Sequence, residues 1–164
     1  MKYFSPELRT ASIVPRWSIV WTQTRDTVAN HSFFVALYAD QIAQAIEWKG
    51  PHGSLLFMAL AHDLDEVITG DIVAPAKHAI LDTGAAEKYI EENMKARLPY
   101  VVERIAAIQA KDPNTYHEAK AIIKAADRLD ALIFLVVEQR LGNSVIAPRI
   151  PECWGSFKEA WDRL

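Results

Sequence analysis

The sequence predicts an all-α protein, a single helical bundle of about six helices that spans residues 1–164. Over long segments the apolar residues recur at three- and four-residue spacing, which is typical of a helix with one buried face. No segment alternates apolar and polar residues as a half-buried strand does. Glycines and prolines separate the helical segments, and 164 residues are enough for one domain with a sizeable core.

The first part of the chain predicts a short helix, an ordered loop and a long helix. Residues 6–13 can form the short helix, which Pro15 ends. Residues 15–26 show no helical period and are expected to form the loop. Thr27 is the expected N-cap of a helix over residues 28–48. The apolar stripe expected on that helix comprises Phe33, Phe34, Leu37, Tyr38, Ile42, Ala45 and Ile46.

The next segment places polar groups at the end of an apolar run. Ser54 can cap a helix that begins with the apolar residues 55–61. If this helix continues, His62, Asp63 and Glu66 share one face, because side chains three and four residues apart are neighbours. Burying such groups is costly unless each is paired or bound to a metal ion. The alternative is a solvated helix end with no task.

The second half of the chain predicts a long helix with clear start and stop signals. Thr115 and Glu118 match a capping box, in which each side chain satisfies a backbone donor of the other residue. The helix is expected to run to about Leu141 and to stop at Gly142. The other elements expected here are a connection at 70–76, a helix at 84–97, a helical piece after Pro99 to about residue 110, a turn at 112–114, an extended segment at 148–151 and a short amphipathic ending at 154–164.

Two acids interrupt the apolar face of this long helix. Asp127 and Asp130 lie on one stripe with Ile123 and Phe134, at three- and four-residue spacing. Arg128 can pair with one of the acids at the surface, which would leave that acid without a further role. A carboxylate held inside the apolar face needs a partner, and a metal ion would supply one.

Three predicted helices therefore offer candidate metal ligands: His31, the pair His62 and Asp63, and Asp127. Two imidazoles and two carboxylates suit a divalent transition metal such as Co²⁺, Mn²⁺, Fe²⁺ or Zn²⁺. Taken alone, His31 could equally be a satisfied or exposed histidine near a helix start.

Composition excludes several classes of protein. The net charge is −3 and no basic block occurs, which argues against a protein that binds duplex DNA or RNA. The single cysteine, Cys153, excludes an internal disulfide framework and fits a reducing compartment. No signal peptide and no membrane span are expected, so we expect a cytoplasmic protein. The 51% content of hydrophobic residues allows for a partner subunit that covers apolar surface.

The order His…His-Asp…Asp resembles the HD-domain phosphohydrolases, an all-α superfamily of metal-dependent enzymes. Order and spacing over about residues 12–138 resemble the bacterial 5′-deoxynucleotidase branch and the short phage dATP triphosphohydrolases of that branch. The resemblance is carried by Arg16-Trp17, Asn30-His31-Ser32, the run His62-Asp63-Leu64-Asp65-Glu66-Val67-Ile68-Thr69-Gly70-Asp71, Pro75-Ala76-Lys77 and Lys124-Ala125-Ala126-Asp127.

This resemblance implies a role for each matching residue. His31, His62, Asp63 and Asp127 match the metal ligands, and Glu66 matches the catalytic acid/base. One departure is Asn30, where the family commonly has Glu; the change weakens a capping box rather than the metal site. Asp130 matches no shared ligand position and is expected beside the ligands or at the surface. The remaining matches are Asp71, which handles water or substrate, Arg16 and Lys77, which approach the phosphates or sugar, Trp17, which packs on the nucleoside, and Ile19 and Pro75, which line the pocket.

The resemblance implies hydrolysis at the 5′ phosphoester of a deoxynucleotide. The first expectation is a dATP-preferring triphosphohydrolase, because Trp17, Ile19 and Pro75 resemble the phage enzymes. The alternative is a 5′-deoxynucleotidase that acts on deoxynucleoside monophosphates. A nucleotide-binding HD domain without turnover and a non-enzymatic interaction module are further alternatives. The resemblance also implies a homo-oligomer (a dimer or a hexamer), a second ion such as Mg²⁺ with the phosphates, and a location in the host cytoplasm if a phage encodes the protein.

Overall fold

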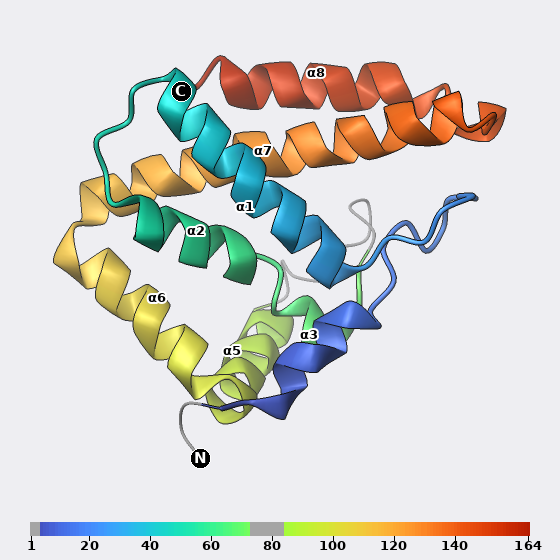
Figure 1. The fold of residues 1–164 in the computed structure, drawn as a ribbon. Helices are drawn as coiled ribbons and strands as arrows, with labels where there is room; N and C mark the ends of the chain where they lie inside the picture. The colour runs from blue at the N-terminus through green and yellow to red at the C-terminus, as the bar shows by residue number, and fades with distance from the viewer. Residues whose placement is uncertain (1–3, 73–83) are drawn as a thin grey trace.

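The computed structural model describes residues 4–72 and 84–164, and these residues form an all-α structure (Figure 1). The all-α prediction is therefore confirmed. Among the described residues, no helix is long and apolar enough to cross a membrane. The elements are the 3₁₀ helix η1 (Pro6–Ser12), α1 (Val28–Ala45), α2 (His52–Ala61), α3 (Glu66–Thr69), α5 (Ala85–Arg97), α6 (Pro99–Lys111), α7 (Pro113–Arg140), the 3₁₀ helix η2 (Ser144–Ile146) and α8 (Arg149–Trp161).

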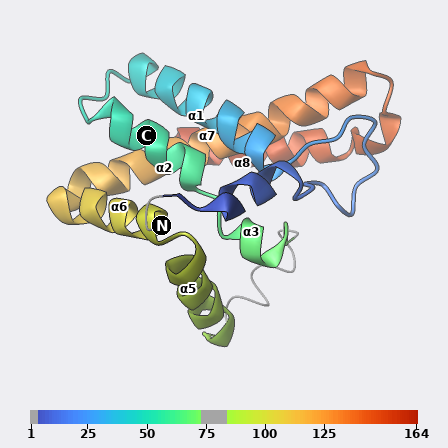
Figure 2. The same cartoon turned by 60° about the horizontal axis from the view of Figure 1, so that its bottom comes forward.

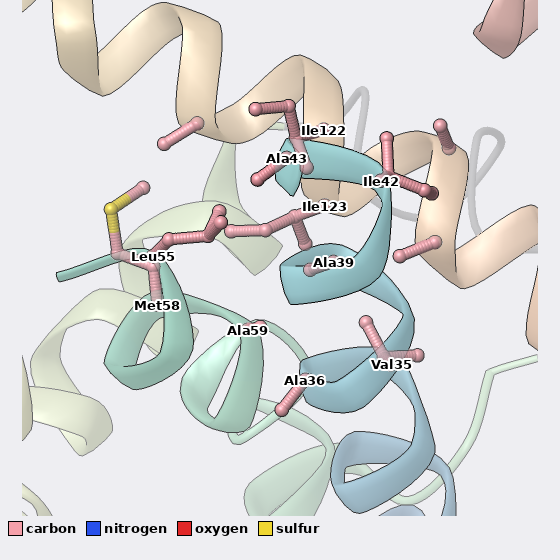
Figure 3. Close-up of a cluster of buried hydrophobic side chains, with 13 residues drawn as sticks. Val35, Ala36, Ala39, Ile42, Ala43, Leu55, Met58, Ala59, Ile122 and Ile123 are labelled. Atoms are coloured by element: carbon pink, nitrogen blue, oxygen red, sulfur yellow. The ribbon is translucent and has the colours of Figure 1, made fainter. Parts of the chain in front are cut away.

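The main core lies where α1, α2 and α7 pack together. Figure 3 shows the side chain of Leu55 in α2 pointing toward Ile123 of α7, with Ala39 and Ala43 of α1 beyond it. Leu55 and Ile122 are almost fully buried, and each burial of this kind stabilises the fold by about 1.5–3 kcal/mol. Helix α8 runs back antiparallel along α7 (Figure 1). This core fixes the three segments that carry the candidate metal ligands.

A second, smaller core supports the turn between α2 and α3. It joins η1, the start of α1, that turn and the junction of α5 with α6. Leu64 and Val67 anchor the turn and α3 in this cluster, and Leu98 enters it from the α5–α6 junction. Figure 2 shows α5 extending away from the bundle of α1, α2, α7 and α8.

The structure corrects the expected apolar stripe of α1. Phe33, Phe34 and Leu37 are 54%, 46% and 45% exposed, and the helix instead buries a face that includes Ala36 and Ala39. The reason is the close packing of α1 against α2 and α7, which favours small side chains such as Ala36, Ala39 and Ala43 along much of that face. Of the expected stripe, only Ile42 is fully part of the core; Tyr38 and Ile46 pack at its edge. The helix also ends at Ala45, three residues before the expected end.

Two other boundaries differ from the sequence prediction. The prediction of a capping box at Thr115 is wrong, because α7 begins earlier and Asp112 is its N-cap. The Asp112 carboxylate accepts hydrogen bonds from the N–H groups of Asn114 and Thr115, both at 3.1 Å. Aspartate is a strong N-cap, and Pro113 suits the first helical position. Glu118 instead accepts a hydrogen bond from the Trp48 indole at 2.9 Å.

The extended segment expected at 148–151 is also wrong. Helix α8 begins at Arg149 and includes Pro151 in its first turn. A proline is tolerated there because the first N–H groups of a helix have no partner within it. By contrast, the caps expected at Thr27 and Gly142 are confirmed: Thr27 accepts from the Asn30 N–H, and the helix stops just before Gly142.

Candidate active site

Three of the four predicted ligands, His31, His62 and Asp63, form one cluster, and Asp127 of α7 approaches it through His31. Nε2 of the buried His31 lies 3.2 Å from Nε2 of His62, 3.4 Å from an Asp127 carboxylate oxygen and 3.5 Å from one of Asp63. His62 Nε2 lies 3.2 Å from the same Asp63 oxygen. Donor atoms of His31, His62 and Asp63 all lie within 4.8 Å of one another, a grouping that could hold a metal ion. The fold thus brings together side chains that lie up to 96 residues apart in the sequence, from His31 to Asp127.

The turn after α2 presents His62 and Asp63. The expected continuous helix is interrupted here, because α2 ends at Ala61 and α3 begins at Glu66. His62 keeps helical backbone angles, and its Nδ1 donates to the Ala59 carbonyl at 2.8 Å. In a neutral ring this bond leaves the lone pair on Nε2, which faces the cluster. His62 and Asp63 are largely buried, so the site is not the solvated helix end that the sequence left open.

Asp130 fixes the ring of His31 from the other side. Its carboxylate accepts a hydrogen bond from His31 Nδ1 at 2.6 Å, which leaves Nε2 of the buried ring facing the cluster. A histidine ligand held in this way has its tautomer and orientation set in advance. Burial raises the pKa of Asp130 to about 6, although the nearby Arg16 opposes the rise. The sequence placed Asp130 beside the ligands or at the surface, and the structure places it beside them.

The two candidate carboxylate ligands are held in the ionised form. Burial alone would raise the pKa of Asp63, but when His62 is protonated its hydrogen bond from Nε2 and its charge outweigh burial, and the pKa of Asp63 is lowered. Burial would likewise raise the pKa of Asp127, and the charge of Lys124 leads the effects that lower it. The second Asp127 oxygen accepts from Lys124 at 3.1 Å and lies 3.8 Å from Arg128. One oxygen of Asp127 therefore faces the cluster while the other faces surface cations.

Glu66 and Asp71 lie on the segment that follows the ligand turn. Glu66 is buried at the first position of α3, and its N–H donates to the Asp63 carbonyl at 3.1 Å. Asp71 accepts a hydrogen bond from the backbone N–H of Trp17 at 3.2 Å. The two predicted catalytic acids therefore have different surroundings: one is buried next to the ligands, and the other holds the loop.

Arg16 and Trp17 begin the loop at residues 16–26. Nη1 of Arg16 is buried 3.9 Å from Asp26 and 4.0 Å from Asp130, and within the described ranges it has no hydrogen-bond partner. The Trp17 ring stacks on Phe134 at 5.3 Å between centroids and 8° between planes. Its backbone φ is +60°, a conformation that costs a bulky residue about 1–3 kcal/mol and that clusters at functional sites.

Three predicted pocket residues remain: Ile19, Pro75 and Lys77. Ile19 is 67% exposed on the same loop. Pro75 and Lys77 lie outside the described residues.

Sequence reasoning missed Glu138, which is fully buried near the end of α7. Its carboxylate accepts hydrogen bonds from the backbone N–H groups of Gln23 at 2.6 Å and Thr24 at 2.8 Å. A signal was available, because Glu138 follows an apolar run and lies four residues after Phe134 on the stripe that holds Asp127 and Asp130.

The comparisons with known proteins agree with this arrangement. The family model for the YfbR-like 5′-deoxynucleotidases matches residues 2–149. The chain is 27% identical to a 5′-deoxynucleotidase of Pectobacterium atrosepticum over 151 residues, which cover 87% of this chain and 75% of that protein. It is 26% identical to the 5′-deoxynucleotidase YfbR of Escherichia coli, with the same coverage.

Solved structures share the fold. A cyanophage S-2L HD phosphohydrolase, DatZ, bound to dA and one catalytic Zn²⁺ ion, superposes with a TM-score of 0.60 at 24% identity and is covered over its full length, as is this chain. A conserved hypothetical protein from Pyrococcus furiosus gives a TM-score of 0.65 at 22% identity, covering 95% of this chain and 96% of that one.

Proposed function

Because the chain belongs to the YfbR-like 5′-deoxynucleotidase family, we propose that it hydrolyses deoxynucleoside 5′-monophosphates to the deoxynucleoside and phosphate. Membership confirms the sequence resemblance and identifies the chain as an HD-domain phosphohydrolase. The sequence placed a dATP triphosphohydrolase first and the monophosphatase second. The names of the family and of the curated relatives favour the second of these, so we place it first.

The observation that carries the proposal is the convergence of His31, His62, Asp63 and Asp127. Donor atoms about 2.1 Å from one ion lie about 3.0–3.4 Å from one another. The distances from His31 to the other three residues and from His62 to Asp63 are 3.2–3.5 Å, within or just above that range. The donor set also fits, since two neutral imidazoles and two carboxylates suit a divalent transition metal. These four residues would hold the ion.

A divalent ion held there would supply Lewis acidity, polarising a phosphoryl oxygen and making a nearby water more acidic. We assign Glu66 the role of taking a proton from the attacking water and passing it to the leaving 5′ oxygen of the nucleoside, because it is buried next to the ligand turn. The guanidinium of Arg16, whose Nη1 has no hydrogen-bond partner among the described residues, would bind the phosphate, since phosphoryl transfer requires charge neutralisation. Trp17 would stack on the base with the face opposite Phe134, and Asp71 would keep Trp17 in place through its N–H.

The triphosphohydrolase is the second candidate, because both reactions break the same bond and differ only beyond the α-phosphate. The metal identity, a second ion with the phosphates and assembly into a dimer or hexamer stay predictions. Light scattering on the purified protein tests the assembly.

Product analysis with Mn²⁺ or Co²⁺ tests the proposed function. We expect phosphate and deoxyadenosine from dAMP, little product from dATP, and no activity after chelation. Glu66→Ala should keep the metal and lose about 10²–10⁴-fold in kcat, which is the usual contribution of a general acid or base. Glu159→Ala, at an exposed glutamate of α8, is the matched control and should keep full activity.

Two other results would change the proposal. Free triphosphate from dATP would establish the triphosphohydrolase in its place. No product from either nucleotide, with the metal confirmed bound, would leave a nucleotide-binding domain without turnover.

A further inference from the structure

The carboxylate of Glu138 joins the end of α7 to the middle of the loop at residues 16–26. It accepts hydrogen bonds from the N–H of Gln23 at 2.6 Å, from the N–H of Thr24 at 2.8 Å, from the Thr24 hydroxyl, and from the Asn143 amide at 2.9 Å. Burying a carboxylate is costly unless its oxygens are satisfied, and these four donors fill the lone-pair sites of both oxygens. We call this set of contacts the loop clasp.

The end of α7 is shaped to complete the loop clasp. Gly142 adopts a φ of +96°, and the N–H groups of Gly142 and Asn143 donate to the carbonyls of Gln139 at 3.0 Å and Glu138 at 3.1 Å. This is the Schellman arrangement of a helix end. It turns the Asn143 side chain back toward α7, where its amide reaches both the Glu138 carboxylate and the Trp21 carbonyl, the latter at 2.8 Å.

Among the residues that the structure describes, few other contacts hold the middle of the loop. Trp21 is 79% exposed, and Gln23 and Thr24 are exposed as well. The two ends of the loop are tied together by the bond from the Arg16 N–H to the Asp26 carbonyl at 3.2 Å. A loop that buries little apolar surface cannot offset the entropy of ordering from packing alone. Its hydrogen bonds to α7 are therefore what orders it.

One stripe of α7 serves the whole site. Asp127 faces the ligand cluster, Asp130 holds His31, Phe134 stacks on Trp17 and Glu138 holds the loop. These residues follow one another at spacings of three, four and four, so they lie on one face. The loop clasp is thus in line with the platform under Trp17 and with the candidate ligands.

We propose that Glu138 is a positioning residue, whose carboxylate holds the loop so that Arg16 and Trp17 meet the nucleotide. This inference rests on the proposed function. Glu138 itself does not touch the substrate. Burial would raise the pKa of its carboxyl, but the hydrogen bonds from Thr24, Asn143 and Gln23 lower it to about 2, so the carboxylate is ionised at neutral pH.

Glu138→Gln tests the proposal, because the new amide group points a donor at the N–H of Gln23 or Thr24. We expect the KM for dAMP to rise about tenfold or more, the size expected when a hydrogen bond to a charged group is lost. The kcat should change less than about threefold, and the metal content should stay the same. Glu118→Gln is the matched control on the same helix, because Glu118 bonds Trp48 outside the loop; its KM should equal that of the wild type.

Trypsin cleavage after the exposed Arg25 gives a second readout that needs no activity. Cleavage should be faster in Glu138→Gln than in the wild type or in Glu118→Gln, because the loop is released. If Glu138→Gln fails to fold, Thr24→Val removes one donor and leaves α7 untouched. We then expect a smaller rise in KM, about threefold, with faster cleavage.

Each other outcome overturns the proposal. An unchanged KM with faster cleavage would mean that the loop clasp orders the loop without positioning the nucleotide. Unchanged cleavage would mean that it does not order the loop. A wild-type protein that neither hydrolyses nor binds dAMP would overturn the proposed function as well, while the cleavage rates would still show whether Glu138 orders the loop.

Discussion

His31 shows how one buried side chain depends on its partners. The ring is fully buried, with Asp130 on Nδ1 and the other candidate ligands around Nε2. The carboxylate sets the tautomer and increases the electron density on Nε2, which strengthens a metal bond. His52 has a similar bond to Asp40, at 2.7 Å, but this pair is partly exposed and lies apart from the cluster. The two His–Asp pairs therefore differ in burial and in whether the ring faces the cluster.

Asp130→Asn should lower the metal affinity about 10–100-fold, because the neutral amide supports the ring of His31 less strongly than a carboxylate does. Competition with a chelator of known affinity measures the change. Asp40→Asn, which alters the exposed pair with His52, should leave the affinity unchanged. Equal affinities in all three proteins would show that Asp130 does not support the ligand.

At the scale of the element, α7 is the organising helix. Its isoleucines pack in the main core, and one stripe of its polar and aromatic residues lines the site. The turn at its C-terminal end forms part of the loop clasp. The left-handed residue Gly142 sets the direction of that turn. A side chain at this position has open space around it, so only the backbone angle opposes substitution. A substitution at Gly142 therefore measures the cost of the backbone angle without a contribution from steric clash.

Gly142→Ala should lower the free energy of unfolding by about 1–2 kcal/mol, the cost of a left-handed backbone for a residue with a side chain. Urea denaturation measures it. Gly53→Ala is the matched control, because Gly53 also has open space around it but lies in α2 with no positive φ. That change should be neutral or stabilising by up to about 1 kcal/mol. Equal effects at both positions would contradict the role given to the backbone angle.

At the scale of the molecule, the candidate ligands come from three elements that the main core packs together. His31 belongs to α1, His62 and Asp63 follow α2, and Asp127 belongs to α7. An ion bound to all of them would link these elements in the native state only. Ligands that bind the native state alone stabilise it by mass action.

Mn²⁺, Co²⁺ or Zn²⁺ at a hundredfold excess over its Kd should stabilise the fold by about 2.7 kcal/mol. For a chain of this length that is a rise in Tm of about 5–10 °C. Differential scanning fluorimetry with and without chelator measures the shift. His62→Ala should abolish it, and His52→Ala, outside the cluster, should keep it. A shift that survives in His62→Ala would place the ion elsewhere.

The sequence by itself determined the all-α class, most of the helices, the cap at Thr27 and the stop at Gly142. These features depend on neighbours within a few residues, so periodicity and capping chemistry reveal them. The sequence also supplied the four candidate ligands and the family, because the run His-Asp-x-x-Glu-Val-x-Thr-Gly-Asp is a local pattern. The roles of these residues stay predictions until they are tested.

Only the tertiary structure decided which face of α1 is buried and which distant residues pair. Most of the large apolar residues predicted the wrong face, because the close approach of α2 and α7 favours small side chains at several positions of the buried face. Asp130 meets His31 across 99 residues, and Glu138 meets Gln23 across 115. No local signal identifies such partners, because a carboxylate in an apolar stripe shows only that it needs a partner. Which partner it has depends on how the helices pack.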